Sequence, residues 1–112
     1  MFANPDDDYN LRIIDFGLAE KLGEGEERVA MRMCGTLEYM SPEVIAEQGH
    51  DMQSDWWALG IVLYELATGS PPFISSDPDI MAESIRFDDI RHKDYFSDEF
   101  KDLMDKLTHK LP

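Results

Sequence analysis

The amino-acid sequence predicts a mainly α-helical fold, with a short β-strand or hairpin remnant near its start. Two observations support this expectation: helix start signals recur through the second half, and apolar residues fall at helical spacing near the end. A third is that only one short stretch, Leu11–Ile14, predicts a strand. With 112 residues, 43% of them hydrophobic, the chain is long enough for one small domain with a core.

The first third of the chain is expected to hold little regular structure. Residues 3–10 indicate a turn, because an Asn-Pro pair favours turns and repeated Asp disfavours both helix and strand. The β-branched run Leu11–Ile14 predicts a strand that leads into a loop at Asp15. Residues 18–35 are rich in glycine and acidic side chains, which predicts a long irregular loop, and long loops tend to be functional.

Three shorter helix signals follow in the rest of the chain. Ser41 begins a short helix with Pro42 at its first position. Asp77 caps a second such helix that runs through about Arg86. Ser97 caps a third, whose apolar residues fall at helical spacing: Phe100, Leu103, Met104, Leu107 and Leu111.

The main helix covers about residues 54–68. It begins at Ser54-Asp55 and ends at Gly69. Its body is apolar on every side apart from Glu65, so we expect it to be buried all round. One short strand and the other helices supply few elements to surround it. The pattern is typical of the interior of a larger structure.

The charge excludes two classes of partner. Acidic residues number 24 against 10 basic ones, for a net charge of −14, which would repel nucleic acid and anionic membranes. The longest apolar run, Trp56–Tyr64, is too short to span a bilayer. The single cysteine, Cys34, indicates a reducing compartment, and the first residues do not resemble a signal peptide. We therefore expect a soluble cytoplasmic (intracellular) protein.

Five short motifs occur in a fixed order. They are IIDFG at 13–17, CGTLEYMSPE at 34–43, DWWALG at 55–60, YEL at 64–66 and GSPPF at 69–73. Together they resemble the eukaryotic protein kinases, and most of all the AGC group of serine/threonine kinases. The resemblance implies that residues 1–112 are a partial catalytic domain from the C-terminal lobe, with an activation segment at 15–43.

The resemblance implies a role for Asp15-Phe16-Gly17 in binding ATP and Mg²⁺. Asp15 matches the metal-binding Asp of the family, and a hard cation takes carboxylate and phosphate oxygens. Phe16 is expected to pack beneath this site, and Gly17 to permit a backbone conformation that a side chain would forbid. The alternative for Asp15 is a loop carboxylate that caps a turn.

A substrate site is implied for the segment Gly35-Thr36-Leu37-Glu38-Tyr39, which matches the family's G-T-P-E-Y with Leu37 in place of Pro. By the same resemblance Thr36 contacts the catalytic loop, and Glu65 binds an arginine of a basic protein substrate. The alternative for Glu65 is a carboxylate at the rim of the helix end.

Two further carboxylates have implied structural roles. Glu43 matches the family's Glu that pairs with a buried Arg, in a variant motif where Ser41 replaces Ala. Asp55 matches the Asp that holds the backbone of the catalytic loop, and a plain N-cap role is compatible with that assignment.

Other kinase parts do not occur in this sequence. It has no Gly-rich loop, no strand Lys and no catalytic-loop Asp and Asn, so the N-lobe and the catalytic loop are absent. His92-Lys93-Asp94 follows the central helix, whereas the catalytic H-R-D precedes Asp-Phe-Gly, so it is a structural segment. We expect the isolated chain to be inactive.

The activation segment has no phosphorylation site between residues 18 and 35, because that stretch contains no Ser, Thr or Tyr. Arg32 stands where AGC kinases carry their activating Thr. We hypothesise that Glu24, Glu26 and Glu27 partly substitute for the phosphate, or that activation follows another route. A modified residue found there by phosphopeptide mapping would contradict this hypothesis.

Two other functions remain open at this point. One is a non-catalytic interaction module derived from a kinase, which would use its central helix to pack on a partner. The other is a free-standing acidic binding domain that only mimics the motifs.

Overall fold

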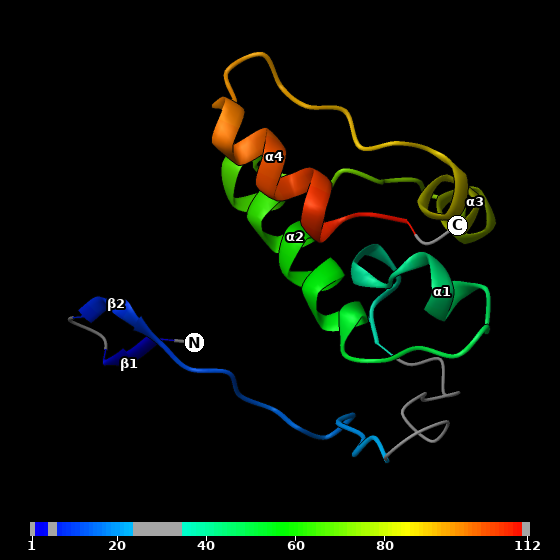
Figure 1. Ribbon diagram of the computed structural model, residues 1–112, viewed down its shortest axis with the longest axis horizontal. Helices are drawn as coiled ribbons and strands as arrows, with labels where there is room; N and C mark the ends of the chain where they lie inside the picture. The colour runs from blue at the N-terminus through cyan, green and yellow to red at the C-terminus, as the bar shows by residue number, and fades with distance from the viewer. Residues whose placement is uncertain (1, 5–6, 24–34, 111–112) are drawn as a thin grey trace.

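A computed structural model describes residues 2–4, 7–23 and 35–110. It confirms the mainly α-helical fold (Figure 1). The elements follow in the order β1 (Phe2–Asn4), β2 (Asp7–Leu11), the 3-10 helix η2 (Leu37–Tyr39), α1 (Pro42–Ile45), α2 (Gln53–Thr68), α3 (Pro78–Phe87) and α4 (Asp98–Leu107). No helix in these residues is long and apolar enough to cross a membrane.

An antiparallel hairpin of β1 and β2 replaces the turn predicted for residues 3–10. Phe2 pairs with Leu11 and Asn4 with Asp7. The strand predicted for Leu11–Ile14 is also wrong, since β2 ends at Leu11 and Ile13 is 86% exposed. The physical reason is that pairing satisfies the backbone N–H and C=O groups of two neighbouring strands, which outweighs the weak strand propensity of Asp.

Helices α2 and α4 lie side by side and run in opposite directions (Figure 1). They approach closely at Gly60, where an added Cβ would lie 2.7 Å from Thr108 Cγ2 and 3.1 Å from Leu107 Cβ. Helix α2 ends as predicted at Gly69, whose φ of 89° lies in the left-handed region that glycine adopts easily. The predicted caps of the later helices are confirmed, because Asp77 and Ser97 accept the backbone N–H groups of Asp79 and Phe100.

Two clusters of buried side chains join the helices. The first lies between α2, α3 and the loop that connects them, with η2 and α1 packed on it, and the second lies between α2 and α4. The buried members are Trp57, Ile61, Phe73, Met81 and Ile85 in the first cluster, and Tyr64, Phe96 and Met104 in the second.

One face of α2 is uncovered, so the expectation of burial on all sides is not met. Trp56, Leu59 and Val62 are exposed, and Leu66 is 78% exposed. Among the described residues, η2, α3 and α4 pack against the other sides of α2. Helix α2 therefore has more apolar side chains than the described elements bury.

We predict that Gly60→Val destabilises the helical body by about 1–3 kcal/mol, because the new side chain has no room against Thr108 and Leu107. Urea unfolding followed by far-ultraviolet circular dichroism measures this change. Ala67→Val is the matched control, since Ala67 lies on the same helix and is exposed. Equal midpoints for the two variants would contradict the close packing of α2 and α4.

Candidate functional site

Tyr39 joins the predicted substrate segment to the central helix. Its hydroxyl donates a hydrogen bond to Glu65 Oε2 over 2.5 Å, across 26 residues of sequence. Leu37 and Tyr39 also pack against the first core cluster. The structure therefore brings the segment 35–39 and Glu65 together at one place on the surface of α2.

The contact with Glu65 changes the acidity of Tyr39. The hydrogen bond to Glu65 raises the pKa of Tyr39 above 10.0, and burial and the negative charges of Glu65 and Glu38 act in the same direction. Because the folded-state pKa is the higher one, the protonated phenol stabilises the folded chain below the ordinary tyrosine pKa. This contribution is lost as the pH rises through the raised value.

We predict that Glu65→Gln returns the pKa of Tyr39 toward 10.0, since it removes the charged acceptor. The tyrosinate absorbance of Tyr39 can be isolated as the difference between the unaltered chain and Tyr39→Phe. If the pH midpoint of the Tyr39 titration is unchanged in Glu65→Gln, the Tyr39–Glu65 hydrogen bond does not form in solution.

The other residues of the substrate segment are open to solvent or partly so. Gly35 is exposed and has a φ of 106°, which places it in the left-handed region. Thr36 is also exposed, and its side chain makes no capping bond to η2. Glu38 is half-buried in the first turn of η2. The hydroxyl of Thr36 is thus accessible to other parts of a larger protein.

Glu43 accepts a hydrogen bond from Ser54, which in turn accepts one from Ser41. Ser41, only 1% exposed, donates from Oγ to Ser54 Oγ over 3.0 Å, and Ser54 donates to Glu43 Oε1 over 2.9 Å. The sequence marks Ser54 only as a helix start and gives no sign of this contact with Glu43. The chain of hydroxyls links the start of α1 to the start of α2.

The carboxylate of Glu43 borders a cavity of about 260 Å³ between α2 and the end of α4. The indole N–H of Trp57 is buried and has no hydrogen-bond acceptor among the described residues. The cavity is lined by Glu43, Gln53, Trp56, Trp57, Lys106, Leu107 and His109.

Asp15-Phe16-Gly17 forms a tight turn apart from the substrate segment. Asp15 has a φ of 63°, which is uncommon without glycine, and its Oδ1 accepts the Gly17 N–H over 3.2 Å. An added Cβ on Gly17 would lie 3.1 Å from that oxygen. The packing predicted for Phe16 is absent in this structure, because its side chain is 70% exposed and no described element covers it.

Asp55 is not the cap of the central helix. It lies exposed in the first turn of α2, which begins at Gln53, before the predicted start. Met52 is the N-cap residue and makes no side-chain capping bond, while the carboxylate of Asp51 accepts the Gln53 N–H over 2.8 Å. The N-cap interpretation of Asp55 is therefore wrong, and its carboxylate faces solvent.

Some residues singled out in the sequence lie outside the described residues, and His92 makes a contact within the fold. Glu24, Glu26, Glu27, Arg32 and Cys34 belong to the stretch 24–34, which the structure does not describe. His92 Nε2 lies 2.7 Å from Asp105 Oδ1, consistent with a structural role. Among the described residues, no group of three His, Cys, Asp or Glu side chains gathers in a metal-binding arrangement.

Comparison with known proteins gives a match along nearly the whole chain. Residues 2–112 match the protein kinase domain family. The serine/threonine-protein kinase AtPK1/AtPK6 of Arabidopsis thaliana is 39% identical over 107 residues, which is 96% of this chain and 22% of that protein. Protein kinase C delta type of Rattus norvegicus is 37% identical over the same share of this chain and 16% of its own length.

A shorter and closer match is the cGMP-dependent protein kinase, isozyme 2 forms cD5/T2, of Drosophila melanogaster. It is 50% identical over 68 residues, which is 61% of this chain and 7% of that protein. The chain thus spans about a fifth or less of the length of these relatives.

Proposed function

This chain belongs to the protein kinase family, and we propose that it forms the part of a serine/threonine kinase domain that seats the protein substrate and holds one metal ligand. The relatives confirm the recognition of an AGC-like kinase fragment. The match to the family excludes the free-standing acidic domain that merely mimics the motifs. The proposed reaction is transfer of the γ-phosphoryl group of ATP to a Ser or Thr hydroxyl.

The observation that best supports this function is the Tyr39–Glu65 hydrogen bond. It keeps a carboxylate beside the segment that would receive the acceptor residue. Since Tyr39 engages Oε2, the other oxygen of Glu65 can accept a charge-assisted bond from a guanidinium group. We therefore propose a protein substrate with basic residues near the acceptor hydroxyl.

Asp15 is proposed as the ligand of Mg²⁺. The chain supplies one carboxylate here, with Oδ1 bound to the Gly17 N–H. A single carboxylate fits Mg²⁺, because this ion is usually held by one or two carboxylates together with substrate phosphates and water. The positive φ of Asp15 supports the assignment, since uncommon backbone conformations cluster at functional sites. When bound with ATP, the ion neutralises charge that develops during phosphoryl transfer.

Thr36 and Asp55 are proposed to support a catalytic loop that the rest of the kinase domain supplies. Both side chains are exposed in this chain, which leaves them accessible to such a loop. Neither is proposed to touch the reacting phosphoryl group, so both are positioning residues.

Glu43 is proposed to pair with the guanidinium group of an arginine outside this sequence. Trp56 and Trp57 line the same cavity as Glu43, and aromatic side chains attract cations. The hydroxyls of Ser41 and Ser54 would hold the carboxylate in place.

The test of the proposed function is a radiolabel transfer assay on two proteins. One is the isolated chain, for which we expect no transfer. The other, here called the completed domain, joins this chain to the N-terminal part of the kinase domain from its rat relative, protein kinase C delta type. We expect the completed domain to label Ser and Thr peptides but not Tyr peptides. Turnover by the isolated chain, or no transfer by a folded completed domain, would overturn the proposal.

A second candidate function is a kinase-derived interaction module without catalysis. The uncovered apolar face of α2 favours it, because exposed apolar patches often mark binding surfaces. If the completed domain is folded and binds ATP but transfers no phosphoryl group, this second function becomes the better explanation.

A further inference from the structure

The loop between α2 and α3 exposes a serine hydroxyl that makes no hydrogen bond among the described residues. This residue is Ser76, and the four residues that follow it are exposed as well. The hydroxyl of the neighbouring Ser75 differs, because it accepts the backbone N–H of Asp77 over 3.1 Å. The hydroxyl of Ser76 is therefore accessible to the active site of another protein.

Two carboxylates follow this hydroxyl closely in the sequence. Asp77 is the next residue, and its Oδ1 accepts the Asp79 N–H over 2.9 Å and so caps α3. The carboxylate of Asp79 is exposed and makes no ion pair among the described residues. No Lys or Arg occurs between residues 33 and 85 to offset these charges. Ser76 thus combines a free hydroxyl with an acidic flank on its C-terminal side.

Two other exposed serines each lack one of these features. Ser97 is followed by two acidic residues, but its Oγ accepts the Phe100 N–H over 3.1 Å as the cap of α4. The hydroxyl of Ser70 makes no hydrogen bond among the described residues, but two prolines follow it where Ser76 has acids. Both serines therefore serve as internal comparisons for Ser76.

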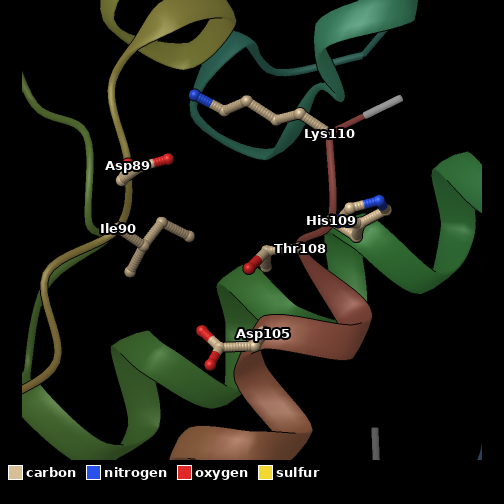
Figure 2. A pocket seen from close by; sticks show the side chains of 6 residues that line it. All are labelled: Asp89, Ile90, Asp105, Thr108, His109 and Lys110. Carbon is tan, nitrogen blue, oxygen red and sulfur yellow. The ribbon is translucent and has the colours of Figure 1, made fainter. Parts of the chain in front are cut away.

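A hydroxyl on a cavity wall is also engaged within the fold. The cavity has a volume of about 470 Å³ and lies between the end of α4 and the loop that follows α3 (Figure 2). Lys110 spans it and donates a hydrogen bond to the backbone oxygen of Asp88. The hydroxyl of Thr108 on the same wall donates to the backbone oxygen of Met104 over 2.7 Å. This cavity therefore offers no free acceptor like that of Ser76.

We propose that Ser76 is a phosphorylation site for a serine kinase that recognises acidic residues after its acceptor. A basic groove on such an enzyme complements Asp77 and Asp79, and charge patterns of this kind govern the choice of substrate by kinases. The site itself does not depend on the function proposed above. If that function holds, the modifying enzyme is a different kinase, because Glu65 is proposed to select basic substrates.

The reaction takes ATP as its second substrate. The oxygen of Ser76 bonds to the γ-phosphorus, the bond from that phosphorus to the oxygen of ADP breaks, and the hydroxyl proton passes through a base of the modifying enzyme to solvent. The backbone is irregular up to Asp77, and α3 begins at Pro78. Only the first turn of α3 must open for an extended groove to reach Asp79, and helix ends open at small cost.

The test is incubation of the full chain with a serine kinase selective for acidic substrates and radiolabelled ATP, followed by peptide mass spectrometry. Ser76→Ala, which removes the acceptor hydroxyl, is expected to lower total incorporation at least about fivefold. Asp79→Asn should slow labelling of Ser76 about tenfold, because it removes a charge that the enzyme pairs. Glu83→Gln, an exposed position further along α3, is the matched control and should stay within about twofold.

Two results of this assay would overturn the proposal. One is incorporation that Ser76→Ala leaves undiminished, which would place the label elsewhere. The other is an equal rate in Asp79→Asn and Glu83→Gln, which would mean that the acidic flank is not recognised.

A second measurement tests the contribution of the fold. Peptides that cover 70–84 and 91–105 present Ser76 and Ser97 without their folded surroundings. The ratio of labelling at Ser76 to labelling at Ser97 is expected to be about threefold or more higher in the full chain than between the peptides, because only the fold engages Ser97 as a helix cap. Equal ratios would contradict the structural basis of the proposal.

Discussion

Asp15→Asn is expected to reduce phosphoryl transfer by the completed domain at least about 100-fold, because it removes the charge that we propose to hold the metal ion on the phosphates of ATP. The amide keeps the size of the side chain and can still accept the Gly17 N–H through its oxygen, so the turn itself is expected to persist. The initial rate of radiolabel transfer at saturating ATP measures the effect.

The control for this prediction is Asp94→Asn, which removes the same charge from an exposed position in the loop before α4. It should leave the rate within about twofold, since isolated surface charges contribute little. A rise in Mg²⁺ requirement for Asp15→Asn, absent in Asp94→Asn, would identify the metal as the cause. Full activity of Asp15→Asn would show that this carboxylate does not hold the metal.

Glu65→Gln is expected to lower kcat/KM for a serine peptide with an arginine at the recognised position by about 10- to 100-fold, because it removes one partner of the charge-assisted pair that we propose. An arginine scan of the peptide identifies that position. With the scanned arginine replaced by alanine, the variant and the original completed domain should become nearly equal. Loss of activity on both peptides alike would indicate that Glu65 supports the fold of the site instead of the substrate.

Tyr39→Phe separates the two roles of the site. It removes the hydroxyl that holds Glu65 but keeps the ring that packs on the first core cluster. A loss smaller than that of Glu65→Gln, and confined to the arginine peptide, is the expected result. Equal losses on both peptides would mean that Tyr39 supports the structure of segment 35–39 and does not act through recognition of the arginine.

Local signals in the sequence predicted helix ends well. Gly69, Asp77 and Ser97 mark ends that the structure confirms, because each acts on backbone groups within a few residues of itself. Helix α2 begins at Gln53, slightly before the Ser54-Asp55 pair that predicts its start, and the carboxylate of Asp51 accepts the first N–H of the helix. Several polar side chains close to the start of a helix can accept its first N–H groups, and the sequence alone does not show which of them does.

Contacts between distant residues were not available from local signals. The hairpin at residues 2–11 forms because two short strands satisfy each other's backbone groups, although their Asp residues disfavour strands. The bond from Ser54 to Glu43 likewise depends on how α1 meets α2. Neither leaves a pattern in the order of the residues.

The sequence by itself determined the family, the helical character and the identity of the candidate residues, because motifs and caps are written in short runs of side chains. Only the tertiary structure decided that Tyr39 bonds Glu65, that Glu43 borders a cavity and that Lys110 spans another. It also decided which face of α2 is buried, since the helix is apolar on nearly every side and its sequence does not distinguish the buried face from the exposed one. These features depend on packing between elements, which a linear pattern does not encode.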